Sequence, residues 1–198
     1  MSRAAVFVDR DGTLIEESGY LNALSRLIFY PFTVDAVRQL NLGGFAIVVI
    51  TNQAGIARGI VPESFVGTAH RHIEDRMAAG GAHIDALYYC PHHPDGTVPA
   101  LRTKCECRKP QPGLLLRAAT ELDLDLSRSF MIGDRFHDLE AGRTAGTRTV
   151  LVRTGYGAAE ERTENPAMRP DAVADNIAGA AAWILQNRPL ITSRARTP

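Results

Sequence analysis

The sequence carries no net charge, because 22 basic residues balance 22 acidic ones in a chain of 198 residues. Without an excess of positive charge, the composition does not favour nucleic acid or another polyanion as a partner. No apolar run is long enough to span a membrane. Asp9, Arg10 and Asp11 also interrupt the N-terminal region where the apolar stretch of a signal peptide would lie. We therefore expect a cytoplasmic protein without membrane or nucleic-acid partners.

Lysine and cysteine are both scarce. Only two of the 22 basic residues are lysines, Lys104 and Lys109, so a lysine beside any candidate site stands out. The cysteines are Cys90, Cys105 and Cys107, an odd number crowded into a short segment. Such a set is a poor disulfide framework and a better metal site.

Apolar strand-like runs alternate with segments of helical periodicity along the chain. The expected strands lie at 4–9, 45–51, 84–90, 128–134 and 147–155. The expected helices lie at 33–44, 61–81, 112–124, 136–146 and 176–187. This alternation predicts an α/β fold with a doubly wound, mainly parallel, five-stranded Rossmann-like sheet covered by helices on both faces. We expect one domain over 1–190 and a flexible tail at 191–198. His70 and His72 are expected on the surface of their helix.

Several acidic residues fall where predicted strands end. Asp9 and Asp11 follow the first strand, where residues two apart share a face and like charges repel. Asp134 ends the fourth strand, and ligands bind at the carboxyl ends of parallel strands. These like-charged carboxylates could lie close together if they bind Mg²⁺, and Asp138 would be a supporting residue of the site. The alternative is a turn pair and a helix cap, and Arg10, on the opposite face, is interpreted as structural.

Two further segments are suited to an anion. Thr51, Asn52 and Gln53 end the second strand and offer a hydroxyl, amides and backbone N–H groups. A simple turn rich in turn-forming residues is an equally good interpretation of this segment alone. Arg108 and Lys109 stand before a predicted helix, whose dipole disfavours cations there. Two cations at this unfavourable position indicate a bound anion; the alternative is a basic pair exposed to solvent.

The cysteine-bearing loop over residues 90–109 predicts a zinc site. It supplies three thiolates and one imidazole, a closed tetrahedral set, from Cys90, His92, Cys105 and Cys107. A closed set of this kind is structural, and its one-residue spacings are tighter than those of zinc fingers. His93 is an alternative to His92 as ligand, and three buried free cysteines are the alternative to a metal site.

Together these motifs resemble the haloacid dehalogenase superfamily of phosphatases. The D-R-D-G-T segment at 9–13 is similar to its first motif, Thr51 to its second and Lys109 to its third. Gly133-Asp134 with Asp138 is similar to its fourth. The cysteine loop and C-R-K-P-Q-P-G narrow the resemblance to the subfamily of heptose bisphosphate and histidinol-phosphate phosphatases. S-G-Y-L-N at 18–22 is closer to the heptose enzymes, whereas Glu17 departs from the Asp that they often carry.

The resemblance implies a magnesium-dependent phosphoric monoester hydrolase. Asp9 would attack phosphorus to form an aspartyl-phosphate. Asp11 would protonate the leaving alkoxide and then take a proton from the attacking water. Mg²⁺ would be held by Asp9, Asp134 and the main-chain oxygen of Asp11. Zn²⁺ would be the second, structural cofactor.

The implied substrate is a small sugar phosphate, foremost the 7-phosphate of D-glycero-D-manno-heptose 1,7-bisphosphate. Contacts with it are expected from Glu17, Gly19, Tyr20, Thr51, Asn52, Gln53, Arg108 and Lys109. The segment between Leu14 and Thr33 is too short for a cap domain, so we expect an open site. A monomer is expected because no interface is visible in the sequence pattern. A histidinol-phosphate phosphatase and a zinc-stabilised binding module without catalysis are the alternatives.

Overall fold

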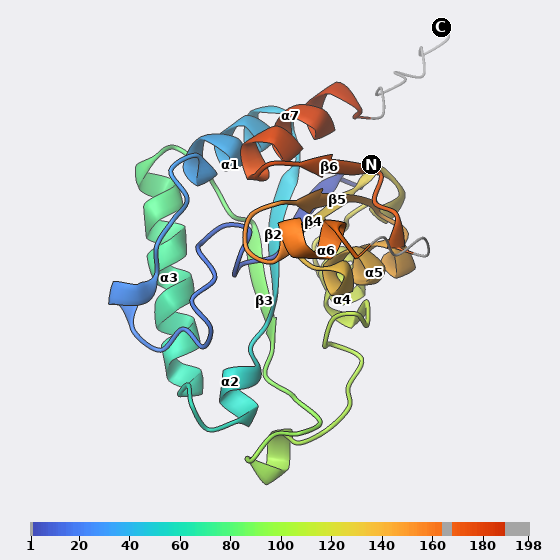
Figure 1. The fold of residues 1–198 in the computed structure, drawn as a ribbon. Coiled ribbons are helices and arrows are strands. Elements are labelled where there is room, and N and C mark those ends of the chain that lie inside the picture. Colours follow the sequence, from blue (N-terminus) through green and yellow to red (C-terminus); the bar gives the residue numbers. More distant parts are fainter. Residues whose placement is uncertain (1, 164–167, 189–198) are drawn as a thin grey trace, which may run out of the picture.

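The computed structural model describes residues 2–163 and 168–188, and the expected tail at 191–198 lies outside them. Its centre is a parallel sheet in the order β3-β2-β1-β4-β5-β6 (Figure 1). The strands are β1 (Ala5–Val8), β2 (Ala46–Asn52), β3 (Ala86–Cys90), β4 (Phe130–Gly133), β5 (Arg148–Val152) and β6 (Ala172–Ala174). The predicted parallel α/β architecture is confirmed.

Helices cover both faces of the sheet. The longer ones are α1 (Thr33–Leu42), α3 (Glu63–Ala79), α4 (Gly113–Glu121), α5 (Phe136–Ala145) and α7 (Ile177–Gln186). Val6 and Val8 of β1 pack with buried residues of α1, α3 and α7, whereas Phe7 packs with residues of α4 and α5. Alternate side chains of a strand point to opposite faces, so this buried tripeptide contributes to two separate cores.

Short elements complete the connections. They are α2 (Ala54–Ala57), α6 (Gly157–Glu161), and the 3₁₀ turns η1 (Leu24–Arg26), η2 (Pro99–Leu101) and η3 (Leu126–Arg128). η1 is the one helical turn between Leu14 and Thr33, and no cap domain is inserted there. Among the described residues, no helix is both long enough and apolar enough to cross a membrane.

The sheet has six strands rather than the five expected. β6 is the three-residue segment Ala172–Ala174, none of it buried, and an apolar run this short was not recognised as a strand in the sequence. It pairs with β5 at the edge of the sheet, where backbone hydrogen bonds define the strand.

The surface placement expected for His70 is wrong, whereas His72 is exposed. His70 is buried on α3 with its ring edge-on to Tyr89. Burial, followed by the positive charge of Arg10, lowers the pKa of His70 to about 4. His70 is therefore neutral at physiological pH and part of the core.

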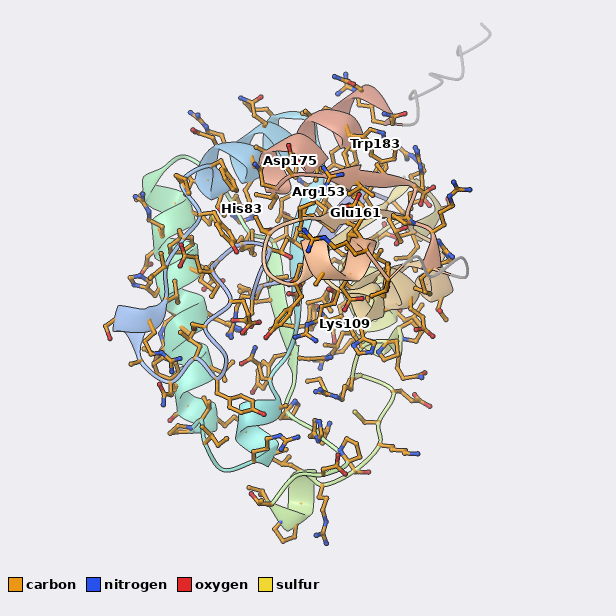
Figure 2. The ribbon with its side chains drawn as sticks, in the orientation of Figure 1. His83, Lys109, Arg153, Glu161, Asp175 and Trp183 are labelled. Carbon is orange, nitrogen blue, oxygen red and sulfur yellow. The ribbon has the colours of Figure 1, made fainter. Side chains whose placement is uncertain are left out.

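An ion-pair network anchors the loop that follows β5. Arg153 contacts Glu161 at the end of α6 at 2.7 Å and Asp175 after β6 at 2.6 Å. Figure 2 shows the three side chains gathered beside α6 and β6. All three are exposed, so the network contributes little stability but restrains the loop that carries Gly155 and Tyr156.

Candidate active site and metal cluster

A pocket of about 360 Å³ opens at the carboxyl ends of the strands. Asp9 and Asp11 follow β1, Thr51 and Asn52 end β2, and Asp134 follows β4, so the parallel sheet brings them to one edge. The pocket is also lined by every residue expected to contact substrate, namely Glu17, Gly19, Tyr20, Thr51, Asn52, Gln53, Arg108 and Lys109.

Three carboxylates meet at the base of this pocket. Asp9, Asp134 and Asp138 are all buried, and each offers an oxygen within 4.8 Å of the others. Such a set of hard oxygen donors fits Mg²⁺ better than a softer metal. Asp138, expected only in support, is a full member of the cluster. Asp11 contributes no side-chain oxygen to it.

Two glycines leave room around the Asp134 carboxylate. Gly12 and Gly155 have positive φ values of 84° and 56°, which glycine adopts readily. A Cβ at either residue would lie 2.2 Å or 2.1 Å from Asp134 Oδ2. Any side chain there would fill the space beside this oxygen. The same oxygen accepts a hydrogen bond from the backbone N–H of Tyr156 at 2.8 Å.

Lys109, labelled in Figure 2, is buried and lies in contact with two of the three carboxylates. Its Nζ lies 2.5 Å from Asp9 Oδ1, 2.6 Å from Asp138 Oδ1 and 2.7 Å from the carbonyl oxygen of Ile50. Burial disfavours the ammonium, but the two carboxylates outweigh this effect and raise the pKa of Lys109. Lys109 is therefore a permanent cation beside Asp9.

One lysine does not neutralise three buried carboxylates. Burial raises the pKa of Asp9 well above its usual value, and Asp138 and Asp134 add to the rise while Lys109 opposes it. Burial, and then the charge of Asp138, raises the pKa of Asp134 to about 7. A divalent cation bound by these oxygens would reverse both shifts, because it supplies the missing positive charge.

The end of β2 supports the site through hydrogen bonds. The Asn52 amide makes two 3.0 Å hydrogen bonds with the backbone of Lys109, one to its N–H and one to its carbonyl oxygen. Gln53 Nε2 donates to Asp11 Oδ2 at 3.1 Å and to Thr51 Oγ1 at 2.8 Å. Asn52 therefore positions the lysine, and Gln53 positions Asp11.

The four predicted zinc ligands also come together. The sulfur atoms of Cys90, Cys105 and Cys107 lie 3.1–3.5 Å apart, and His92 Nδ1 lies 3.3 Å from that of Cys107. A tetrahedral zinc with bonds of roughly 2.3 Å separates its sulfur ligands by about 3.8 Å, so a small expansion accommodates the ion. His93 lies outside this cluster and lines the pocket instead.

The pocket is also lined by residues that the sequence analysis did not identify. Arg135, His137 and Tyr156 line it together with Glu17, which accepts a hydrogen bond from the Gly19 N–H at 2.6 Å. The Arg135 guanidinium lies 3.6 Å from the centre of the Tyr156 ring. The position of Arg135 directly after Gly133-Asp134 was the available signal for it.

Comparisons with known proteins agree with this geometry. Residues 106–180 match the family model described as HAD-hydrolase-like. A Yersinia pestis protein named D-glycero-beta-D-manno-heptose-1,7-bisphosphate 7-phosphatase is 44% identical over 152 residues, 76% of this chain and 81% of that protein. A Rhodopseudomonas palustris protein of the same name is 44% identical over 144 residues, with 73% and 80% covered.

A solved structure is similar over nearly the whole chain. The D,D-heptose 1,7-bisphosphate phosphatase from B. bronchiseptica, complexed with magnesium and phosphate, superposes with a TM-score of 0.82. It is 30% identical, and the match covers 92% of this chain and 98% of that one.

The pKa of Asp134 predicts how pH and Mg²⁺ affect stability. Without a divalent cation, the folded chain keeps a proton up to about pH 7 that the unfolded chain releases near 3.8. The free energy of unfolding should therefore fall between about pH 4 and 7, by on the order of 2–4 kcal/mol. Mg²⁺ should raise the melting temperature more at pH 8 than at pH 5, in thermal melts without chelator.

Asp134→Asn should lose the Mg²⁺ effect and the part of the pH dependence that Asp134 contributes, while the part due to the raised pKa of Asp9 remains. Asp35→Asn on the exposed face of α1 is the control and should keep both. Equal stabilisation of wild type and Asp134→Asn by Mg²⁺ would contradict the assignment of Asp134 to the metal cluster.

Proposed function

Because the chain belongs to the haloacid dehalogenase-like phosphatases, in the family of the heptose 1,7-bisphosphate 7-phosphatases, we propose that it hydrolyses the 7-phosphate of D-glycero-D-manno-heptose 1,7-bisphosphate. The chain is a magnesium-dependent phosphoric monoester hydrolase. The observation that carries the substrate proposal is the base of the pocket. There, Asp9 and Lys109 lie in contact beside two further carboxylates. Arg108 and Arg135 line the same pocket.

Asp9 is the nucleophile of the proposed reaction. One of its oxygens forms a bond to phosphorus as the bond from phosphorus to the sugar oxygen breaks, which gives an aspartyl-phosphate. Lys109, held in place by Asp9 and Asp138, binds the phosphoryl oxygens whose charge must be stabilised in the transition state. Thr51, at the end of β2, contributes its hydroxyl to the same group.

Asp11 is proposed to act first as the general acid and then as the general base. It gives a proton to the leaving sugar oxygen and then takes one from the water that attacks the aspartyl-phosphate. Asp9, Asp134 and Asp138 would hold Mg²⁺, which supplies positive charge to the phosphoryl oxygens when bound. The pocket is completed within one chain, which supports a monomer as the catalytic unit.

The cysteine cluster is proposed to bind a structural Zn²⁺. Its three thiolates and one imidazole leave no position for a reacting water. Cys107 lies two residues before Lys109, and the backbone of Lys109 is bound by Asn52. Zinc at this position would fix the loop that delivers the lysine to Asp9.

Two arginines are proposed to recognise the phosphate that is not cleaved. Arg108 and Arg135 both line the pocket, and both are half-buried. Arg108 Nη1 donates to the His92 carbonyl oxygen at 3.2 Å, which ties its guanidinium to the cysteine loop. An arginine held in this way keeps further donors for a phosphate group.

A substrate panel tests the proposed function. The value of kcat/KM should be highest for heptose 1,7-bisphosphate, lower by at least about tenfold for histidinol phosphate, and negligible for all substrates without Mg²⁺. Asp9→Asn should abolish turnover and keep its circular dichroism spectrum. A preference for histidinol phosphate would reassign the substrate. No phosphate release from any ester, including 4-nitrophenyl phosphate, would favour the binding module.

Replacing Arg108 should affect bisphosphates selectively. Arg108→Gln is expected to raise KM by about tenfold or more for a sugar bisphosphate but by less than about threefold for the monophosphate, because it removes a contact with the second phosphate only. Steady-state kinetics on both esters measures this. Arg102→Gln, an exposed arginine on the same loop, is the control. Equal effects of Arg108→Gln on both esters would refute the role.

A further inference from the structure

Arg10 is the largest of the fully buried side chains, although it carries a permanent positive charge. Its Nε donates to Asp11 Oδ2 and its Nη2 to Asp11 Oδ1, each at 3.0 Å, and Nη2 also lies 2.8 Å from Oδ2. Hydrogen bonds from two guanidinium nitrogens to one carboxyl group fix its orientation as well as its position. The Arg10 guanidinium therefore binds the carboxyl group of Asp11, the residue proposed above to transfer the protons.

Asp11 is the one ion-pair partner of Arg10 within residues 2–163 and 168–188. On α3, the buried His70 is close enough for the charge of Arg10 to help keep its imidazole neutral. No second carboxylate from the described elements competes for the guanidinium. Asp11 is the carboxyl group to which Arg10 donates, and a carboxyl that carries a proton on one oxygen still accepts hydrogen bonds through its lone pairs, so Arg10 can hold Asp11 in either protonation state.

The two oxygens of Asp11 have unequal surroundings. Oδ2 accepts from Arg10 Nε at 3.0 Å, from Gln53 Nε2 at 3.1 Å and from Thr51 Oγ1 at 3.4 Å, and Arg10 Nη2 lies 2.8 Å from it. Oδ1 has Arg10 Nη2 as its hydrogen-bond donor among the described residues. Oδ1 is therefore the oxygen with capacity left for a proton, in a carboxyl group that lines the pocket.

We propose that Arg10 is a positioning residue for proton transfer, because it holds the Asp11 carboxyl with Oδ1 available to the leaving group. The inference rests on the function proposed above. As the bond from phosphorus to the sugar oxygen breaks and the bond from Asp9 to phosphorus forms, the proton on Oδ1 moves to that sugar oxygen. The sugar leaves as an alcohol, and Oδ1 later accepts the proton of the attacking water.

The leaving group distinguishes this role from a purely structural one. 4-Nitrophenolate departs without a proton, whereas a sugar alkoxide needs one, so only the second reaction depends on the orientation of Asp11. The ratio kcat/KM reports phosphoryl transfer to Asp9 and excludes the later attack of water. We therefore compare kcat/KM of Arg10→Gln and Arg10→Lys on 4-nitrophenyl phosphate and on heptose 1,7-bisphosphate.

Arg10→Gln should lower kcat/KM by about 100-fold or more for the heptose ester and by less than about tenfold for 4-nitrophenyl phosphate. Arg10→Lys, which keeps the charge but loses the two-pronged geometry, should give the same selectivity at smaller amplitude. Adding Asp11→Asn to Arg10→Gln should not increase the selectivity beyond that of Asp11→Asn alone, since Arg10 acts through Asp11.

Arg3→Gln is the matched control, because Arg3 forms an ion pair with Asp85 at 2.8 Å and does not line the pocket. It should leave both kcat/KM values unchanged. Equal losses on both esters in the Arg10 variants, or no loss, would overturn the proposal. If Arg10→Gln does not fold, the selectivity of Arg10→Lys decides. A wild-type enzyme inactive on both esters would instead contradict the proposed function.

Discussion

The contact of Lys109 with Asp9 and Asp138 is the interaction on which the rest of the site depends. Three buried carboxylates at the ends of neighbouring elements repel one another, and a buried ammonium at 2.5–2.6 Å from two of them offsets part of that repulsion. The charge that remains unbalanced is what a divalent cation would supply. The same unfavourable arrangement of charges thus makes the base of the pocket a site for both a metal and a phosphate.

The position of Lys109 is set by two features that take no part in the chemistry. Asn52 binds its backbone from the end of β2, and Cys107 lies two residues before it in the four-residue cluster with metal-ligand geometry. A loop without regular secondary structure would otherwise have the freedom to move a lysine by more than the reaction tolerates. On this account, the proposed structural zinc and the catalytic magnesium would be linked through one short segment of chain.

Much of the fold and site could be predicted because strand-end rules apply to a parallel sheet, and they brought Asp9, Thr51 and Asp134 to one edge. The ion pair between Arg10 and Asp11 could not be predicted from the sequence. The alternation rule put these residues on opposite faces, but β1 ends at Val8 and the chain bends at Arg10, so the alternation no longer applies there. The apolar run of β6 is only three residues long, which is too short to predict a strand. The burial of His70 depends on packing between elements, which helical spacing does not encode.

The central claim is that Asp9 becomes phosphorylated during turnover. Acid quenching during turnover of 4-nitrophenyl phosphate, followed by borohydride reduction, would convert an aspartyl-phosphate to homoserine. Tandem mass spectrometry of the N-terminal peptides then locates the modified residue. The account predicts homoserine at residue 9, and none there when phosphate ester is omitted. Homoserine at another aspartate, or unmodified Asp9 during rapid turnover, would contradict it.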